Sequence, residues 1–428
     1  MPLWRRPQLL SLPRHQPARS LALAGIAAVF LVAATGCHRS GFPVYPSNYR
    51  EFAYVTNGGS DTVSVIDLVN LRSDRVVQAG QQPTGVAASP TRNEVYIVNS
   101  GRGNSNGSLS ILNTESNHIL TTIPLHRQPY FVSVDAEGKR AYVANSGSNN
   151  ISVIDLDRRR EIAVAGAGEQ PGLAVISPDS RSLVATNRGS GSISIYAVSD
   201  DATQPLRLRT VLEGCPGATD AVILPDSSKA FIACSSGHQV MAIQLATTAS
   251  AATAPATITP DAATPARPAA KDLLLDLLDV GKTPVHLAMK PDGGEIFVSN
   301  FDGNSISEID TSANEVGGTY MIGEHPVRGI VSADNSTLWV ANFGADSVSA
   351  YSIDDGKVTD NVRTGSAPDA LALSAAGNLL LAVDSRSGDV AVIRTQARSD
   401  YQSRSLFTLL PAGVQPNAIV VKAFLVKK

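Results

Sequence analysis

One short phrase, apolar-x-apolar-x-Asn, returns along most of this chain at nearly constant spacing. Eight copies occur, six of them closing on Asn, and they end at Asn57, Asn99, Asn145, Asn187, Cys234, Asn300, Asn342 and Asp384. The steps between these positions are 42, 46, 42, 47, 66, 42 and 42 residues. A period of about 40 to 45 residues is typical of a four-stranded blade in a β-propeller. The spacing therefore restricts the chain to a ring or array of small β-sheets.

A second landmark divides each repeat in the same place. A proline opens a short apolar segment at Pro83, Pro129, Pro171, Pro216, Pro284, Pro326, Pro368 and Pro416. Proline has no N–H and suits the first residue of a strand. Each unit therefore reads as a Pro-strand, an Asn-strand, a Ser-containing third strand and a weaker outer strand.

The two ends of the repeat array are complementary. The array begins with the Asn-strand 53–57, which no Pro-strand precedes, and it ends with the Pro-strand Asn417–Val421, which no Asn-strand follows. Pairing these two incomplete ends would close the ring and remove its free edges. We therefore predict an all-β propeller of eight four-stranded blades over residues 51–428. Seven blades is the alternative, should the unit around Leu380–Asp384 not form a full blade.

One step of the repeat is longer than the others because of an insertion. Residues 246–271 are mostly Ala, Thr and Pro, with almost no large apolar side chain. Such a composition cannot bury enough surface to fold. Without this segment the 66-residue step shrinks to the ordinary length, so we expect a disordered surface loop within a regular blade.

The N-terminus has the layout of a lipoprotein export signal over residues 1–36. Four Arg and no acid precede an apolar run from Leu21 to Ala34, which ends in Thr35-Gly36-Cys37. The run is short for a membrane span, and small residues before a Cys are typical of a lipid attachment site. We expect lipidation at Cys37 followed by a flexible tether, residues 37–50. The alternatives are an uncleaved anchor and export by the twin-arginine route through Arg5-Arg6.

Charge and export together set the expected compartment and partners. Removal of the signal leaves 31 basic against 38 acidic residues, a net charge of about −7. Such a surface disfavours nucleic acid. We expect a monomer in the periplasm or at the cell surface, with the outer membrane favoured, touching the membrane only through its lipid.

The first repeat carries a resemblance to a known family. Tyr54-Val55-Thr56-Asn57 is identical to the four letters that name the YVTN family of β-propeller repeats, and Ser64-Val-Ile-Asp67 is similar to the strand that follows it there. The resemblance extends over roughly residues 51–426. It implies a propeller but no particular activity, because similar propellers include surface-layer and adhesion proteins, lactonases and haem-bearing domains.

Two cysteines remain in the mature chain besides Cys37. Cys215 lies at the start of one predicted strand and Cys234 at the end of the next, which places them on one face of an antiparallel pair. We expect a disulfide, which an exported protein permits. A reactive or metal-binding pair that includes His238 is the alternative.

Known catalytic and cofactor motifs are missing from the sequence. There is no Cys-x-x-Cys-His, His-Glu-x-x-His or phosphate loop. We therefore predict no catalytic residue, cofactor or metal. We interpret the repeated Asn as a turn-capping residue rather than a ligand.

The candidate binding face is formed by residues before each Pro and by the loops after each Asn. Loops on a rigid ring are where binding residues concentrate. The residues chosen are Gln82, Gln128, Gln170, His325 and Gln415, with Cys215 in the corresponding place of one unit, and the loop residues Arg102, Arg127, Arg188, Phe301 and Phe343.

The function that follows is a lipid-anchored scaffold that binds a protein or peptide through this face. The alternative is a lactonase-like or redox-accessory propeller with a site in the central channel. A purely structural role in the envelope is a third reading. A catalytic channel would require convergent Glu, His, Arg or Asp side chains, whereas the predicted ring is mostly Gln.

Overall fold

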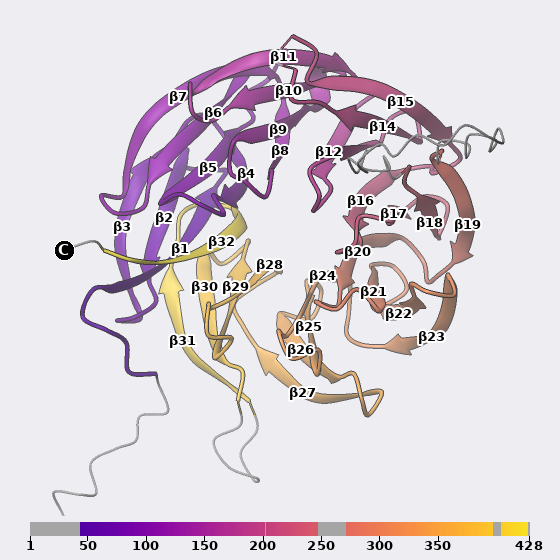
Figure 1. Cartoon of the computed structure of the whole chain (residues 1–428). Helices are drawn as coiled ribbons and strands as arrows, with labels where there is room; N and C mark the ends of the chain where they lie inside the picture. Colours follow the sequence, from indigo (N-terminus) through magenta and orange to yellow (C-terminus); the bar gives the residue numbers. More distant parts are fainter. Residues whose placement is uncertain (1–42, 202, 247–270, 397–403, 427–428) are drawn as a thin grey trace, which may run out of the picture. The chain divides into compact units, whose positions relative to one another are not determined.

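The protein is an eight-bladed β-propeller. The structure, a computed structural model, describes residues 43–201, 203–246, 271–396 and 404–426. The predicted export signal, Cys37 and residues 247–270 of the predicted insertion lie outside these ranges. Residues from Tyr45 onward form one compact unit. Eight antiparallel four-stranded sheets follow one another around a ring (Figure 1).

Each of the first four blades consists of four short strands that follow one another in the sequence. Blade 1 consists of β4 (Pro83–Ala88), β5 (Glu94–Asn99), β6 (Asn106–Asn113) and β7 (His118–Arg127). Blade 2 consists of β8 (Pro129–Val134), β9 (Arg140–Asn145), β10 (Asn150–Asp155) and β11 (Arg160–Gly166), with a 3-10 turn at Ser146–Ser148. Blade 3 consists of β12 (Pro171–Ile176), β13 (Ser182–Asn187), β14 (Ser192–Val198) and β15 (Leu206–Glu213). Blade 4 consists of β16 (Ala218–Ile223), β17 (Lys229–Cys234), β18 (Gln239–Gln244) and β19 (Leu273–Asp279).

The next three blades repeat this order, and the last combines both chain ends. Blade 5 consists of β20 (Pro284–Met289), β21 (Glu295–Asn300), β22 (Ser305–Asp310) and β23 (Glu315–Met321). Blade 6 consists of β24 (Pro326–Val331), β25 (Thr337–Asn342), β26 (Ser347–Ser352) and β27 (Lys357–Arg363). Blade 7 consists of β28 (Pro368–Leu373), β29 (Leu379–Asp384), β30 (Asp389–Arg394) and β31 (Ser405–Pro411). Blade 8 consists of β32 (Pro416–Leu425), β1 (Tyr49–Asn57), β2 (Thr62–Asp67) and β3 (Arg72–Gln78).

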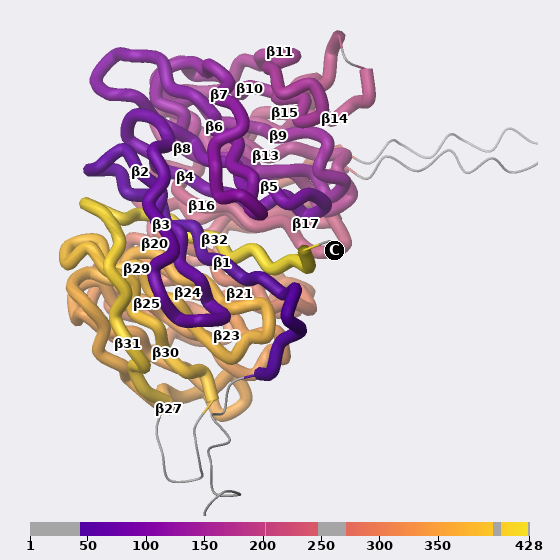
Figure 2. Tube along the Cα trace, turned by 90° about the vertical axis from the view of Figure 1, so that its left-hand side faces the viewer, coloured from indigo at the N-terminus to yellow at the C-terminus, as the bar shows by residue number. Residues whose placement is uncertain are grey.

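The ring closes by the predicted pairing of the two chain ends. Strand β32 lies beside β1 as the innermost strand of blade 8, with Val55 opposite Ile419 (Figures 1 and 2). The paired region is longer than the sequence indicated, because β1 begins at Tyr49 and β32 continues to Leu425. Strand β29, the unit that was doubtful in the sequence, is buried throughout. The seven-blade alternative is therefore wrong.

The repeated Asn fastens the second strand of each blade to the third. In six blades its Nδ2 donates to side-chain oxygens on the third strand, which lie five and seven residues later in five of these blades. For Asn99 they lie nine and eleven residues later. For Asn300 these are Ser305 and Ser307, at 3.2 and 2.9 Å. In two blades Oδ1 also accepts a backbone N–H, as when Gly168 donates to Asn187 at 3.1 Å. The residue is a buried clamp, and its main partners are hydroxyls rather than the turn backbone that the sequence suggested.

A glycine three residues before the proline that opens the inner strand makes room for this clamp. A Cβ on Gly281 would lie 2.5 Å from the side chain of Asn300, and one on Gly323 would lie 2.3 Å from that of Asn342. Contacts this short are forbidden, so glycine is required there. The Gly-x-x-Pro spacing of the repeat thus follows from the buried Asn.

Two blades replace the clamp with different chemistry. In blade 4 the position is Cys234, which forms a disulfide with Cys215 across a sequence separation of 19. In blade 7 it is Asp384, which lies opposite a second carboxyl, Asp389. Both Cys234 and Asp384 are fully buried.

The apolar core lies between successive blades and is assembled from the second strands. Aromatic residues recur at one register position of these strands and are almost completely buried. They are Tyr54, Tyr96, Tyr142, Phe231, Phe297 and Trp339. The ring is therefore a rigid support for the loops and inner strands. Among the described residues no helix is long and apolar enough to cross a membrane.

Candidate functional site

The residue before each inner strand is held in the left-handed backbone region. Among the predicted residues φ is 54° at Gln82, 49° at Gln128, 50° at Gln170, 50° at His325 and 51° at Gln415. In blade 4 this place belongs to Gly217, at 68°, because Ala218 is the residue opposite Cys234. The assignment of Cys215 to this place was wrong by two residues. These positions share a backbone conformation, and the glutamines among them are exposed.

The predicted glutamines do not converge on one ligand site. Gln82 and Gln415 line a common pocket, whereas Gln128 and Gln170 do not border it. The loop arginines are also separated. Arg102 forms an ion pair with Asp61 at 2.8 Å, while Arg127 and Arg188 are exposed on blades 1 and 3.

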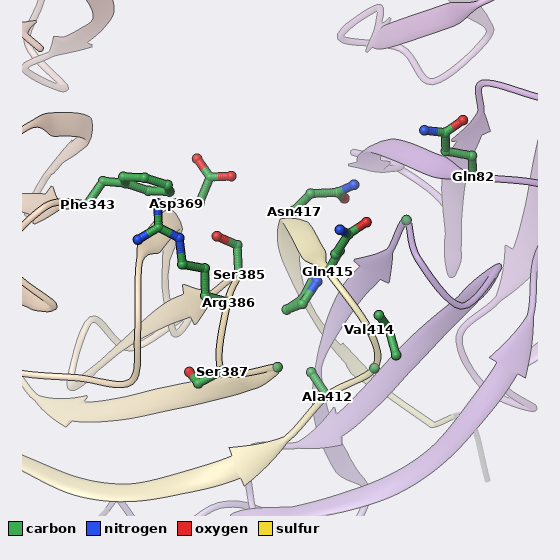
Figure 3. A pocket seen from close by; sticks show the side chains of 14 residues that line it. Gln82, Phe343, Asp369, Ser385, Arg386, Ser387, Ala412, Val414, Gln415 and Asn417 are labelled. Carbon is green, nitrogen blue, oxygen red and sulfur yellow. The ribbon is translucent and has the colours of Figure 1, made fainter. Parts of the chain in front are cut away.

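A pocket of about 850 Å³ lies on the face where the inner strands begin. Its walls come from the loop before β4, the β25–β26 loop, blade 7 and the start of β32. Figure 3 shows Phe343 and Arg386 on one side, Gln415 and Asn417 opposite, and the Asp369 carboxyl between them. This volume is in the range of sites that hold small molecules.

Phe343 and Arg386, which line one side of this pocket, belong to a row of stacked side chains that continues beyond it. The Phe301 and His325 rings stack at 4.4 Å, and the Phe301 and Phe343 centroids lie 6.5 Å apart. The guanidinium of Arg386 lies 4.8 Å from the Phe343 centroid. Both phenylalanines are only half-exposed. These contacts bring three of the predicted face residues together, but much of their aromatic surface is used within the protein.

An Asp–His pair joins two neighbouring inner strands. Oδ2 of Asp220 on β16 lies 2.8 Å from Nδ1 of His286 on β20, and the two side chains are 16% and 14% exposed. The same carboxylate accepts the backbone N–H of Ala221 at 3.0 Å and that of Leu287 at 2.8 Å. The contact is an ion-pair approach, and Nδ1 of His286 has no hydrogen-bond partner in the described structure.

The surroundings of this pair favour a neutral imidazole beside a carboxylate. Burial lowers the pKa of His286, the positive charge of Arg328 lowers it further, and Asp220 opposes both. Burial opposes ionisation of Asp220, but His286, Arg328 and the Leu287 N–H outweigh it and lower the pKa of that carboxyl. A neutral imidazole and a carboxylate are the forms that proton-transfer chemistry uses.

Two more charged groups continue the series on the next inner strands. Arg328 on β24 is exposed. It has the same register position as His286, because each of the two faces the second-to-last residue of the second strand in its own blade. Asp369 follows on β28 and lines the pocket. Burial raises the pKa of Asp369, and Arg328 opposes that rise. Four consecutive inner strands thus supply Asp220, His286, Arg328 and Asp369.

These four residues were missed by sequence reasoning. The sequence pattern pointed to the residue before each Pro. Asp220, His286 and Arg328 instead lie two residues after the first residue of their inner strand, and Asp369 lies one residue after it. At the register position of His286 other blades carry Gly85, Phe131 and Leu173. Aligning the eight Pro-strands and searching for charge among apolar residues would have found them. The inner strands of blades 4 to 7 therefore do carry the neighbouring Asp, His and Arg side chains that a catalytic channel requires.

Metal-ligating side chains were considered as well. In the part of the chain that the structure describes, no three His, Cys, Asp or Glu residues are grouped so as to hold a metal ion.

Comparison with known proteins places the fold within a broad group. Residues 329–404 match the model of the family "Lactonase, 7-bladed beta-propeller". The match covers β24 to β30 and spans a minor part of the chain. A search of curated proteins finds no match.

Solved structures resemble the ring along most of its length. Dihydro-heme d1 dehydrogenase NirN in complex with DHE has a TM-score of 0.67 at 13% identity, covering 89% of this chain and 76% of that one. The periplasmic gluconolactonase PpgL of Pseudomonas aeruginosa has a TM-score of 0.53 at 15% identity, covering 87% and 98%. The hydrazine synthase of Kuenenia stuttgartiensis has a TM-score of 0.52 at 19% identity, covering 80% and 92%. At these identities the likeness shows a β-propeller and nothing finer.

Proposed function

We propose that this propeller is a lactonase-like hydrolase whose site lies where the central channel meets the pocket. The observation that carries the proposal is the convergence of Asp220, His286, Arg328 and Asp369 from four neighbouring inner strands. The partial match to a lactonase family and the likeness to a gluconolactonase support the same reading. The geometry favours this alternative over the non-enzymatic scaffold expected from the sequence.

The chemistry follows from the charge of each group. Lactone hydrolysis needs a base that takes a proton from water and a positive group near the carbonyl oxygen, where negative charge develops. In the proposal Asp369 accepts the proton of the attacking water, and Arg328 stabilises the oxyanion. When the ring C–O bond breaks, Asp369 returns the proton to the leaving alkoxide. The imidazole of His286, backed by Asp220, supplies a second polar contact in the channel.

The raised pKa of Asp369 suits this role. Burial moves the pKa of the carboxyl toward neutrality, and a group with a pKa nearer the working pH is both a better base and a better returning acid. Arg328 has no hydrogen bond or ion pair with any described residue, so its donors are free to bind substrate oxygen.

The test is hydrolysis of a lactone panel by the purified propeller. Aldonolactones and simple γ- and δ-lactones are followed by pH-stat against their spontaneous rates. Asp369→Asn is expected to lower kcat by about 100-fold or more. Glu315→Gln, on the exposed outer strand β23, is the matched control and should leave kcat unchanged. A folded wild-type ring that accelerates none of these lactones contradicts the proposal.

The scaffold function is retained as a second candidate because of the stacked wall. Phe301, His325, Phe343 and Arg386 form a continuous run of rings and one cation at the pocket rim. Affinity capture from envelope extracts by wild type and by the Phe301→Ala/Phe343→Ala variant separates the two candidates. Specific partners lost in the variant, together with no lactone turnover, would favour the scaffold.

We further propose that the mature chain is a lipoprotein anchored through Cys37 in the periplasm or at the cell surface. The proposal rests on the sequence of residues 1–37, in which an apolar run and small residues precede Cys37. Metabolic labelling with a palmitate analogue should mark the wild-type protein and not Cys37→Ser. Equal labelling of both would overturn the anchor.

A further inference from the structure

Blade 7 departs from the clamp of the six Asn blades at three positions. Asp384 replaces the Asn, Asp389 replaces the residue five positions later, and Ala391 replaces the Ser seven positions later. Asp384 and Asp389 lie directly opposite each other on β29 and β30. An amide donor facing hydroxyls has thus become one carboxyl facing another.

The atoms of the pair show where a proton belongs. Oδ2 of Asp384 accepts the N–H of Gly365 at 2.9 Å, as Oδ1 of Asn57 accepts the N–H of Gly413 at 3.0 Å. The other oxygen, Oδ1, therefore takes the place of the amide Nδ2. It is buried without a partner, and so is Oδ1 of Asp389. Two unprotonated carboxylates can only accept, so their contact requires a hydrogen between them.

The pair also stands directly beneath one wall of the candidate pocket. Between the two residues runs the loop Ser385 to Gly388, and all four loop residues line the pocket. Arg386 of this loop is the cation over Phe343. Any change in the separation of the two carboxyls moves the ends of this loop.

We propose that Asp384 and Asp389 share one proton and that its loss loosens the 385–388 loop, making the pocket wall pH-dependent. The statement about the pocket rests on the proposed function, whereas the proton sharing does not. Like charges at hydrogen-bond distance within a buried site cannot both be ionised without separating. The loop is held by a few hydrogen bonds to Ser366, Ala367 and Ala412, whereas β29 and β30 are each paired with a strand on both sides, so the loop is the segment that yields.

No charged group on the surrounding segments forms an ion pair with Asp384 or Asp389 among the described residues. The adjoining segments carry the charged groups Asp346 before β26, Arg363 on β27, Asp369 on β28 and Arg386 in the loop itself. None of them forms a hydrogen bond or ion pair with either carboxyl in the described structure. The loop 412–415, which packs from blade 8, contains no titratable side chain.

The direction of the pH effect follows from the site. Burial first, and then the neighbouring carboxyl of Asp389, raise the pKa of Asp384 from 3.8 to about 8, although the N–H of Gly365 and the side chain of Thr364 oppose the rise. At a pH between these two pKa values the folded protein keeps a proton on Asp384 that the unfolded chain releases. Stability therefore falls as pH rises from about 4 to about 8 and has lost this contribution above that range.

The test compares wild type with Asp384→Asn, which restores the amide found in six other blades. Melting temperature is measured from pH 5 to pH 9 by circular dichroism. The wild type should lose at least about 3 °C relative to Asp384→Asn over this range. Parallel curves for the two proteins would overturn the proposal, as would a steeper curve for the variant.

A second measurement follows the loop itself. Amide hydrogen exchange at residues 385–388, corrected for intrinsic base catalysis, should rise at least about 10-fold in wild type from pH 6 to pH 9. It should stay flat in Asp384→Asn and in loop 301–304, the matched loop of blade 5. Exchange that stays flat in wild type contradicts the proposal.

Measuring the melting temperature with and without calcium distinguishes a proton shared by Asp384 and Asp389 from a cation bound between them. Adding millimolar CaCl₂ at pH 9 should leave the wild-type melting temperature within error of the EDTA sample. A calcium-dependent rise that is absent in Asp384→Asn/Asp389→Ser would overturn proton sharing. None of these measurements uses lactone turnover, so failure of the proposed activity and failure of the switch are separate results.

Discussion

The carboxylate of Asp220 bridges two blades, because it lies 2.8 Å from Nδ1 of His286 and accepts the N–H of the next residue, Leu287, at the same distance. An inner strand of one blade thus holds the imidazole of another. The arrangement fixes His286 at the channel and also determines how it titrates.

The first prediction concerns the titration of His286. Burial and Arg328 lower its pKa, while Asp220 raises it. The Asp220→Asn variant should therefore show a lower His286 pKa than wild type, and Arg328→Met should show a higher one. The measurement is NMR of the His286 Cε1–H signal across pH 4 to 8. A wild-type value at or above that of an ordinary histidine contradicts this account.

Stability should respond to the same residue in acid. Because the folded pKa of His286 lies below the value of 6.5 for an unperturbed group, the unfolded chain binds the proton first. Stability contributed by the neutral ring is present above 6.5 and is lost as pH falls through that value toward the folded pKa. Replacing His286 with Asn should flatten this part of the curve, which thermal unfolding between pH 4 and 7 would record.

A buried ion pair between blades 3 and 4 gives the second prediction. Arg209 donates from Nε and Nη2 to Asp272 at 2.6 Å each, and the two side chains are 16% and 0% exposed. Asp272 also accepts the N–H of Ala246, so it joins both ends of the insertion. Asp272→Ala should lower the free energy of unfolding by about 3 to 5 kcal/mol, because it leaves a buried guanidinium unpaired.

Chemical denaturation provides the measurement for Asp272→Ala. The exposed Glu213→Gln on β15 serves as control and should change stability by less than about 0.5 kcal/mol. A loss below about 1 kcal/mol in Asp272→Ala would show that the pair contributes little.

The third prediction concerns the disulfide of blade 4. Cys215 and Cys234 are both fully buried and close a loop with a sequence separation of 19. Replacing both with Ala should cost about 3 kcal/mol, chiefly through the greater freedom of the unfolded chain. The melting temperature with and without the pair tests this, and reduction of the wild type should reproduce the double variant. Unequal results would indicate a packing effect of the substitutions.

The fourth prediction concerns the Asn clamp. Asn342 is buried and donates to Ser349 at 2.8 Å. Asn342→Ala should destabilise the fold by about 1 to 3 kcal/mol, because it removes this bond and leaves Ser347 and Ser349 with fewer partners. Ser349→Ala is expected to cost less, since Asn342 keeps its second acceptor. The ranking of the two variants by urea denaturation decides the matter, and a reversed ranking would contradict the clamp.

The fold was predictable because its signals are local and repeated. Strand order, blade number and terminal closure all follow from where Pro and Asn stand in each repeat. The chemistry of Asn57 and its equivalents was less accessible. The partners of Asn57 lie five and seven residues later on the opposite strand, so the clamp appears only when the register is known.

The site was harder to predict because it has no repeat signature. Asp220, His286, Arg328 and Asp369 are far apart in sequence, and only the circular order of blades 4 to 7 makes them neighbours. The glutamines that the sequence favoured share a left-handed backbone instead of a ligand. A position defined by its repeated residue type reports on folding, while the position that varies between blades carries the chemistry.

The pairing of β1 with β32 also sets the order of events in biosynthesis. Strand β1 is made before every other strand of the ring, yet its inner partner is the last of them, β32. Until β32 leaves the ribosome, β1 presents an unpaired edge whose side chains from Phe52 to Asn57 become buried only in the finished ring. A truncated product would keep that edge open for other strands to occupy. Synthesis of β32 therefore protects β1 from aggregation.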